Sequence, residues 1–236
     1  MMDATQEEPA RVLAEELRAI LENLSTQEIG AQQLVSACAL ARELRAQLQG
    51  PRRARWYEAD GEAAKYSPSR AAETTRSPRS PDHVAPMEHS PIRGALNPIA
   101  PPVHVEVVRD DPAHPQCVEG RVTLGQAYEG VADAVHGGWV AAIFDDVLGA
   151  AQGLLDAPGV TAILRTRFRE LTPLAEELCF RAWVHEHRGR RITLRATCHA
   201  GRTLTADAEA IFLKVDFGAL RGRMRTLRAE RQGRPA

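Results

Sequence analysis

The sequence lacks closely spaced cysteines, a long hydrophobic run and a net charge, and each absence excludes a class of protein. The four cysteines are scattered without a CxxC pair, which indicates neither a zinc knuckle nor a disulfide framework: Cys38, Cys117, Cys179 and Cys198. We therefore expect free thiols in a reducing cytoplasm. Thirty basic residues against thirty-one acidic ones give a formal charge of −1, so the overall charge offers no argument for nucleic acid or an anionic membrane.

Signals for export and for membrane insertion are missing as well. The first residues, MMDATQEEPARVL, are acidic and do not contain the apolar core of a signal peptide. The longest near-continuous apolar run, from Val135 to Phe144, is much shorter than the ~20 residues that a membrane-spanning helix needs. We expect a cytoplasmic protein with no transmembrane segment, no nucleic-acid partner and no metal or redox cofactor.

Residues 1–50 are expected to form an N-terminal helical extension, because apolar residues recur there at steps of three and four. The pattern predicts two amphipathic helices with a break around STQEIG, a start near Pro9 and a stop at Gly50-Pro51. They carry no converging set of polar residues. We interpret them as a packing or dimerisation appendage rather than a catalytic unit.

Residues 51–100 are rich in proline, serine and arginine, and this composition buries too little apolar area to offset the entropy of ordering. We expect a mobile or extended linker, whose last part, SPIRGALNPIAPP, lies as an ordered strap over a core. Residues 218–236 form an arginine-rich tail. We interpret the tail as a solvated terminus, with binding to the acidic N-terminal helices, an anionic membrane or nucleic acid as alternatives.

Residues 101–217 have the pattern of an α+β domain. Strand-like runs from Val103 and Gln116 precede a helical stretch from Ala134 to Leu155, and four further runs follow, starting at Thr161, Glu176, Arg190 and Arg202. The helix is apolar on more than one side, as expected for a helix enclosed by a curved sheet. We expect an antiparallel sheet wrapped around one central helix, which is the hotdog fold, and we expect the last four strands to follow one another as a meander.

The start of the predicted helix, AVHGGWVAAIFDD, carries the chemistry. If the helix begins near Gly137 or Gly138, its first N–H groups have no intrahelical partner and the helix dipole adds positive charge there. Glycine leaves those groups uncovered, so this end can polarise a carbonyl oxygen and serve as an oxyanion hole. The alternative is that the glycines only permit a tight entry into the helix.

Asp145 follows Gly138 by seven residues and lies on nearly the same helix face at ~100° per residue, within a stripe of small residues. The alternative is a solvated acid, for which Asp146 is the better candidate. Seven residues at ~1.5 Å each separate Gly138 from Asp145 by about 10 Å, too far for both to contact one carbonyl. Two antiparallel copies would satisfy the geometry, which predicts a homodimer or a dimer of dimers with composite sites.

The motif YEGVADAVHGGWVAAIFDDVLG, with Thr161 at the start of the next strand, resembles the hotdog-fold acyl-CoA thioesterases of the phenylacetate-pathway and human thioesterase-superfamily-member type. In that family a His-Gly-Gly opens the central helix, an acid follows nine positions after the histidine, and a threonine or serine lies on the following strand. His136 plus nine is Asp145, and Asp145 plus sixteen is Thr161. The resemblance covers residues 103–216.

By this resemblance, Asp145 is the general base or nucleophile toward a thioester carbonyl, and the Gly138 N–H polarises that carbonyl. Thr161 from the partner side positions water or the carboxylate, and His136 orients the substrate or braces the turn. A carboxylate held against apolar neighbours is less well solvated and therefore a better base. No cofactor is implied, since CoA enters only as part of the substrate.

Substrate contacts are expected from Gly137 and Trp139, with Trp139 and Phe144 shaping the acyl pocket. Arg165 and Arg167 alternate along one strand face and are candidate contacts for the phosphates of CoA, although a solvated strand face explains them equally well. The predicted function is that of an acyl-CoA thioesterase, a thioester hydrolase. The alternative is a non-catalytic acyl-CoA-binding or scaffold protein with the same fold.

Overall fold

The structure is a computed structural model. It describes residues 4–51, 88–109, 114, 116–155 and 159–216, with six single positions between 219 and 230. Most of the expected linker and most of the arginine-rich tail therefore lie outside the described residues. None of the described helices is long and apolar enough to cross a membrane.

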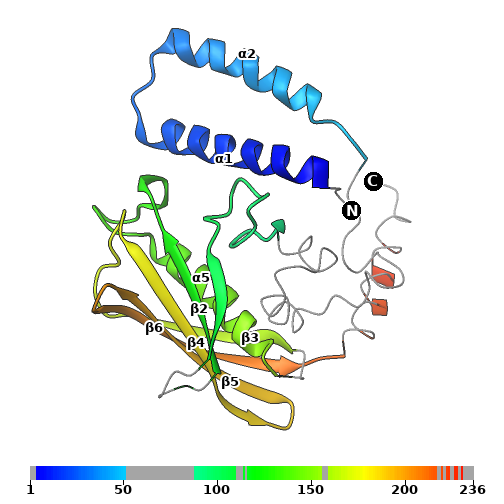
Figure 1. Ribbon diagram of the computed structural model, residues 1–236, viewed down its shortest axis with the longest axis vertical. Coiled ribbons are helices and arrows are strands. Elements are labelled where there is room, and N and C mark those ends of the chain that lie inside the picture. The colour runs from blue at the N-terminus through cyan, green and yellow to red at the C-terminus, as the bar shows by residue number, and fades with distance from the viewer. Residues whose placement is uncertain are drawn as a thin grey trace.

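Six strands form one antiparallel sheet in the spatial order β1-β2-β4-β5-β6-β3 (Figure 1). Their bounds are β1 His104–Arg109, β2 Gln116–Thr123, β3 Gly159–Phe168, β4 Glu177–Arg188, β5 Arg191–Ala200 and β6 Thr203–Lys214. All six predicted strands are present. The predicted four-strand meander is wrong, because β3 pairs with β6 at the edge and only β4, β5 and β6 follow one another. The position next to β4 is taken by β2, so the chain enters β3 at the edge opposite β1.

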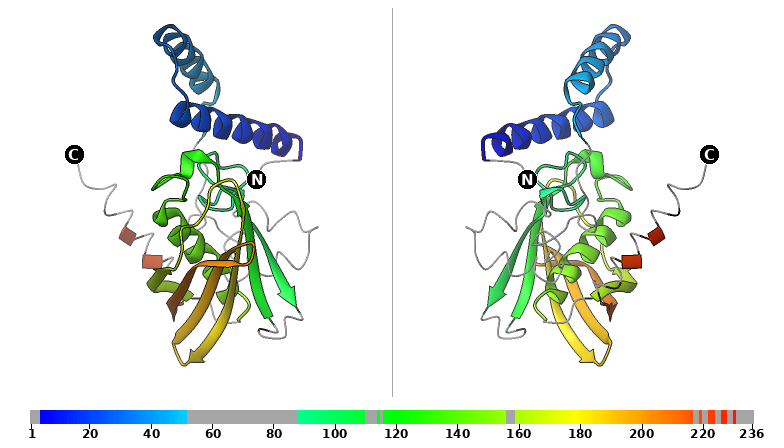
Figure 2. Two further views of the ribbon diagram at one scale, coloured as in Figure 1. Left: turned by 90° about the vertical axis from the view of Figure 1, so that its left-hand side faces the viewer. Right: turned by 90° about the vertical axis from the view of Figure 1, so that its right-hand side faces the viewer.

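Helix α5 (Gly137–Gln152) packs against one face of this sheet (Figure 2) and forms the centre of the core. The rings of Phe144 on α5 and Phe180 on β4 meet edge to face, with centroids 5.1 Å apart. A Cβ on Gly120 of β2 would lie 2.7 Å from Val147 Cγ1, so the close approach of helix and strand requires glycine at that position. An antiparallel sheet around one apolar helix confirms the predicted α+β hotdog fold.

The N-terminal extension consists of α1 (Ala4–Thr26) and α2 (Ala31–Gln47), separated where the sequence predicts a break. The predicted start near Pro9 is wrong, because α1 already begins at Ala4. Glu7 in the first turn interacts favourably with the helix dipole, which supports a start ahead of the proline. α1 lies across one end of the hotdog domain, whereas α2 lies farther out and has no buried residue (Figures 1 and 2).

Residues 88–103, called the strap here, lead into β1 as a series of turns. Ala100 and Val103 are buried, and the Val103 N–H donates to the carbonyl oxygen of Ile92 at 3.2 Å. The side chain of Ile92 packs against the hydrophobic core. The strap therefore closes part of the domain beneath α1.

Glu119 on β2 is a buried carboxylate held by two arginines. Its oxygens lie 2.6 Å from Arg121 Nη2 and 2.6 Å from Arg181 Nη2. Burial tends to raise the pKa of Glu119, but hydrogen bonds from Arg181 and Arg121 outweigh that effect and hold the pKa below its usual value. The stability that the ionised carboxylate contributes is therefore present above its pKa in the unfolded chain and is lost as the pH falls through its pKa in the folded chain.

Replacing Glu119 by glutamine should lower the free energy of unfolding by about 1–3 kcal/mol at pH 7, because the two arginines lose a buried charged partner. The matched control is Glu177→Gln, whose carboxylate is exposed and lies 2.6 Å from Arg121; it should cost less than about 1 kcal/mol. Urea unfolding of both variants measures the difference. The cost of Glu119→Gln should shrink toward acidic pH, and equal costs for the two variants at pH 7 would contradict this role of Glu119.

Candidate functional site

His136 caps the N-terminus of α5 and fixes how the preceding loop enters the helix. Its N–H donates to the Tyr128 carbonyl oxygen at 2.8 Å, and its Nδ1 accepts the Gly138 N–H at 3.0 Å. The expectation that the Gly138 N–H is uncovered is therefore wrong, because the adjacent imidazole covers it. Nδ1 accepts a hydrogen bond only when the ring is neutral and carries its proton on Nε2. His136 thus caps the start of the helix, and its expected roles at the site stay predictions.

Two glycines allow the loop, the helix start and β3 to approach one another. A Cβ on Gly130 would lie 2.7 Å from His136 Cα, and a Cβ on Gly137 would lie 3.0 Å from the ring of Phe168. At this helix end, the N–H of Gly137 is left without an acceptor in the described part of the chain, as is usual for the first residue of a helix.

The two adjacent acids of α5 have opposite environments. Asp145 is exposed, on the helix face that also carries Gly138. Asp146 points toward the strap: its side chain is 16% exposed, and its Oδ2 lies 3.0 Å from Arg93 Nε. The interpretation of Asp146 as the solvated acid is therefore wrong. One residue turns a helix by ~100°, which carries Asp146 into the contact between α5 and the strap.

Burial raises the pKa of Asp146; the positive charge of Arg93 opposes this rise and the negative charge of Asp145 adds to it. Arg93 Nε and Asp146 Oδ2 lie within ion-pair distance but make no well-aligned hydrogen bond, so their attraction is mainly between charges. This ion pair fastens the strap to α5 one residue away from the candidate catalytic acid.

Thr161 is an exposed residue on β3, which is an edge strand. Among the described residues, β3 pairs on one side only, with β6, and its register shifts between Thr161 and Ile163. Val160 and Ile163 are also exposed. An exposed edge strand with apolar side chains is a surface on which another strand can pair.

The arginines of β3 face acids on β6. Arg165 Nη1 lies 3.8 Å from Glu209 Oε1, and Arg167 Nη1 lies 3.8 Å from Asp207 Oδ1. Arg169 Nε also contacts Asp207, at 2.5 Å. Such exposed pairs each contribute at most about 1 kcal/mol. They explain the arginines within the sheet, and a contact of Arg165 and Arg167 with the phosphates of CoA stays a prediction.

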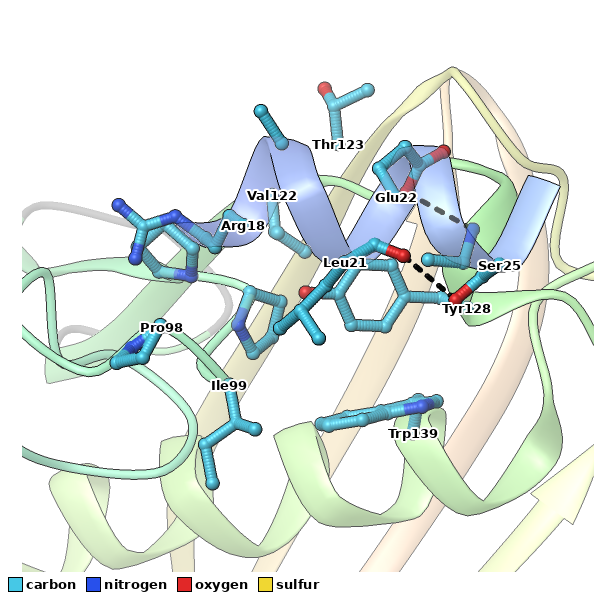
Figure 3. Close-up of a pocket in the computed structure, with 14 residues that line it drawn as sticks. Arg18, Leu21, Glu22, Ser25, Pro98, Ile99, Val122, Thr123, Tyr128 and Trp139 are labelled. Carbon is cyan, nitrogen blue, oxygen red and sulfur yellow. Dashed lines mark hydrogen bonds between the residues drawn. The ribbon is translucent and has the colours of Figure 1, made fainter. Parts of the chain in front are cut away.

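Trp139 lines an open cavity of about 530 Å³ between α1, the strap, the end of β2 and the start of α5 (Figure 3). Phe144, the other aromatic residue expected at the acyl pocket, is fully buried and does not line this cavity. The sequence reasoning missed Leu21 of α1 and Ile99 of the strap, which do line it. No motif marks these two residues, since only the folded chain brings them to the helix start.

Thiol and metal chemistry find little support among the described residues. Cys198 is buried, and burial raises the pKa of its thiol to about 12, so the reactive thiolate is not formed at neutral pH. In the described part of the chain, no group of three or more His, Cys, Asp or Glu residues is arranged to hold a metal ion.

The fold and the open face of α5 define a hotdog protein with a candidate site at the helix N-terminus. Residues 133–210 match the family model described as "Thioesterase superfamily". This stretch of the chain is a thioesterase-superfamily domain, and the resemblance drawn from the His-Gly-Gly motif is confirmed at that level. No curated protein matches the sequence.

The comparison with solved structures gives one similarity over most of the chain and two over less than half of it. The crystal structure of a thioesterase superfamily protein is 25% identical, with a TM-score of 0.69, and covers 87% of this chain and 90% of that chain. A putative thioesterase from Ralstonia eutropha, a phenylacetic acid degradation-related protein, is 20% identical over 46% of this chain and 83% of its own, with a TM-score of 0.40. A hypothetical thioesterase from Streptococcus pneumoniae with coenzyme A is 13% identical over 48% and 89%, with a TM-score of 0.41. The first of these similarities extends well beyond the hotdog domain.

The Arg93–Asp146 ion pair gives a test of how the strap is held. Arg93→Met should lower the free energy of unfolding by about 3 kcal/mol, because it leaves Asp146 buried without its counter-charge. The double variant Arg93→Met/Asp146→Leu should recover part of that loss, since no charge then remains buried. Urea unfolding of the two single variants and the double variant completes the cycle; strictly additive costs would exclude coupling between the two side chains.

Proposed function

We propose that this protein is an acyl-CoA thioesterase, which hydrolyses the thioester of an acyl-CoA to a free acid and CoA. One observation carries the proposal: Asp145 and Gly138 share the exposed face of α5, and Thr161 is exposed on the open edge strand β3. The thioesterase-superfamily domain at residues 133–210 supports the reaction class. No metal or cofactor is required for this chemistry.

The proposed reaction uses the N–H groups at the start of α5 and the carboxylate of Asp145, which lies farther along the same exposed helix face. Asp145 acts as general base, taking a proton from the water that attacks the thioester carbon, or it attacks that carbon itself to form an anhydride, which water then hydrolyses to the free acid and the carboxylate. The N-terminal N–H groups of α5 stabilise the tetrahedral oxyanion, whose collapse releases the CoA thiolate. Gly137 supplies the N–H without an acceptor among the described residues, and rotation of the exposed His136 ring frees the N–H of Gly138 for the same carbonyl oxygen.

A composite site between two subunits completes this proposal. Gly138 and Asp145 are ~10 Å apart along one helix, so one chain cannot direct both at a single carbonyl. Asp145 is also exposed in the single chain, and a second copy covering it would give the partial desolvation that strengthens a base. The exposed apolar edge of β3 next to Thr161 is the surface on which we propose that the two copies meet. Arg165 and Arg167 on the same strand are the proposed contacts for CoA phosphates.

The direct test compares wild type with Asp145→Asn on a panel of short, medium, long and aromatic acyl-CoAs. The asparagine variant should lose at least ~10²-fold in kcat, because amide nitrogen and oxygen cannot replace the carboxylate as a base. The matched control is Glu106→Gln, an exposed carboxylate on β1, which lies at the opposite edge of the sheet from β3 and Thr161, and it should keep wild-type rates. If wild type binds acyl-CoA but hydrolyses none, the thioesterase proposal is wrong and the alternative of a non-catalytic acyl-CoA-binding protein takes its place.

Mixing two impaired variants tests the composite site. Gly138→Pro removes one of the two N–H groups proposed to stabilise the oxyanion, and proline is compatible with the first turn of a helix. If each site combines Gly138 of one subunit with Asp145 of the other, a mixed dimer of Gly138→Pro and Asp145→Asn contains one intact site. When the two variants are unfolded and refolded together, random pairing makes half of the dimers mixed, and each mixed dimer has one intact site of two. The mixture should therefore recover up to about one quarter of wild-type activity. Two sites that are each complete within one chain would give no recovery.

A further inference from the structure

The cavity beside Trp139 is built in part by the N-terminal extension. Tyr128 lies between Leu21 of α1 and Trp139 of α5, and Ile99 of the strap faces the same space (Figure 3). The rings of Tyr128 and Trp139 meet edge to face, with centroids 5.0 Å apart. The cavity therefore has one wall from the hotdog domain and one from residues that precede it.

Two charged side chains hold α1 in place over the cavity. Arg18 Nη1 donates to the carbonyl oxygens of Ala95 and Asn97 in the strap, at 3.3 and 3.2 Å. One helical turn later, Glu22 Oε2 accepts the N–H of Ala127 at 3.1 Å, in the loop that leads to α5. Both charges are engaged with backbone groups, so the helix is fixed to both the strap and the loop.

The lining is chemically suited to an apolar group. Leu21 and Ile99 are 43% and 59% exposed, although they face a cavity whose other walls are Tyr128, Trp139 and Val122. Apolar side chains that remain exposed inside a concave site gain stability when an apolar ligand covers them. The volume of about 530 Å³ falls within the range of small-molecule pockets, roughly 300–1,000 Å³, and far exceeds the needs of an acetyl group.

The cavity adjoins the candidate oxyanion site. Trp139 directly follows Gly138, and the carbonyl oxygen of Tyr128 accepts the N–H of His136. The same two residues, Tyr128 and Trp139, therefore support the helix start and line the cavity. A thioester whose carbonyl lies at the N-terminus of α5 would have this cavity within reach of its acyl group.

We propose that α1 and the strap form one wall of the acyl pocket, so that the N-terminal extension selects an apolar acyl group larger than acetyl. This inference rests on the proposed thioesterase function. It gives α1 a role in substrate selection, whereas its sequence pattern indicates a packing appendage. The lining is poorly suited to the phosphates of CoA, because Arg18 is the single arginine among the described residues that line it and its Nη1 already donates to the strap.

The test fills the pocket from each of its two outer walls. Leu21→Trp and Ile99→Trp add bulk to exposed positions that line the cavity, where an indole causes no clash in the core. Leu24→Trp is the matched control, since Leu24 lies on the same helix, is 59% exposed and does not line the cavity. The kcat/KM of each variant is measured with acetyl-, octanoyl- and phenylacetyl-CoA; the last two distinguish a chain from a ring as the occupant.

Leu21→Trp and Ile99→Trp should each lower kcat/KM for octanoyl- or phenylacetyl-CoA at least ~10-fold more than for acetyl-CoA. The reason is that one methylene group more or less in an apolar pocket already changes the ratio of kcat/KM between two substrates by about that factor. Leu24→Trp should leave the ratio between substrates at its wild-type value. If wild type is active and none of the three variants changes its preference among the acyl groups, the proposed acyl pocket is wrong, whereas the thioesterase proposal still stands.

If wild type shows no hydrolysis, binding of a non-hydrolysable octanoyl-CoA thioether tests the acyl pocket separately from the thioesterase function. In that case the thioesterase proposal fails. Calorimetry that finds weaker binding of the thioether in Leu21→Trp than in Leu24→Trp would still support an acyl site at the cavity. Equal binding in all variants would overturn the site as well.

Discussion

The burial of α5 against the six-stranded sheet is the constraint on which the rest of the structure depends. The sheet takes the apolar side of the helix, including Phe144 and Val147, and leaves the face with Gly138 and Asp145 exposed. Because the helix cannot rotate without exposing its core residues, the orientation of the candidate catalytic groups is set by hydrophobic packing. The N–H groups at the start of α5 and the carboxylate of Asp145 are thereby held on one side of a rigid element, and the proposed composite site takes one of these groups from each of two copies.

Charged groups at the border of this core attach the additional segments to it. Arg93 brings the strap to α5 by pairing with Asp146, and Arg18 and Glu22 bind α1 to the strap and to the loop before α5. Buried or half-buried charges of this kind hold a geometry because an unpaired charge there is costly, even where the net gain in stability is small. The consequence is a hotdog domain whose cavity has a wall from the N-terminal extension, and this wall is the feature that we connect with acyl selection.

Much of the fold could be predicted because local patterns encode it. Alternating apolar residues marked the six strands, an apolar stretch after His-Gly-Gly marked α5, and three- and four-residue steps marked α1 and α2. The errors have a common origin in tertiary contacts. The place of β3 beside β6 depends on which edge the chain reaches after α5, and the environments of Asp145 and Asp146 depend on where the strap lies. The hydrogen bond from Gly138 to His136 likewise depends on a side-chain rotamer that spacing does not reveal.

The sequence alone determined the class of fold and the identity of the candidate site residues, because hydrophobic periodicity and the spacing of His136, Gly138, Asp145 and Thr161 are properties of the linear chain. Only the tertiary structure decided which acid is buried, which N–H is covered and which segments enclose the cavity. These outcomes arise from contacts between residues far apart in sequence, such as Glu22 with Ala127 and Arg93 with Asp146. Such contacts are selected by the free energy of the whole packed core, and no local pattern specifies them.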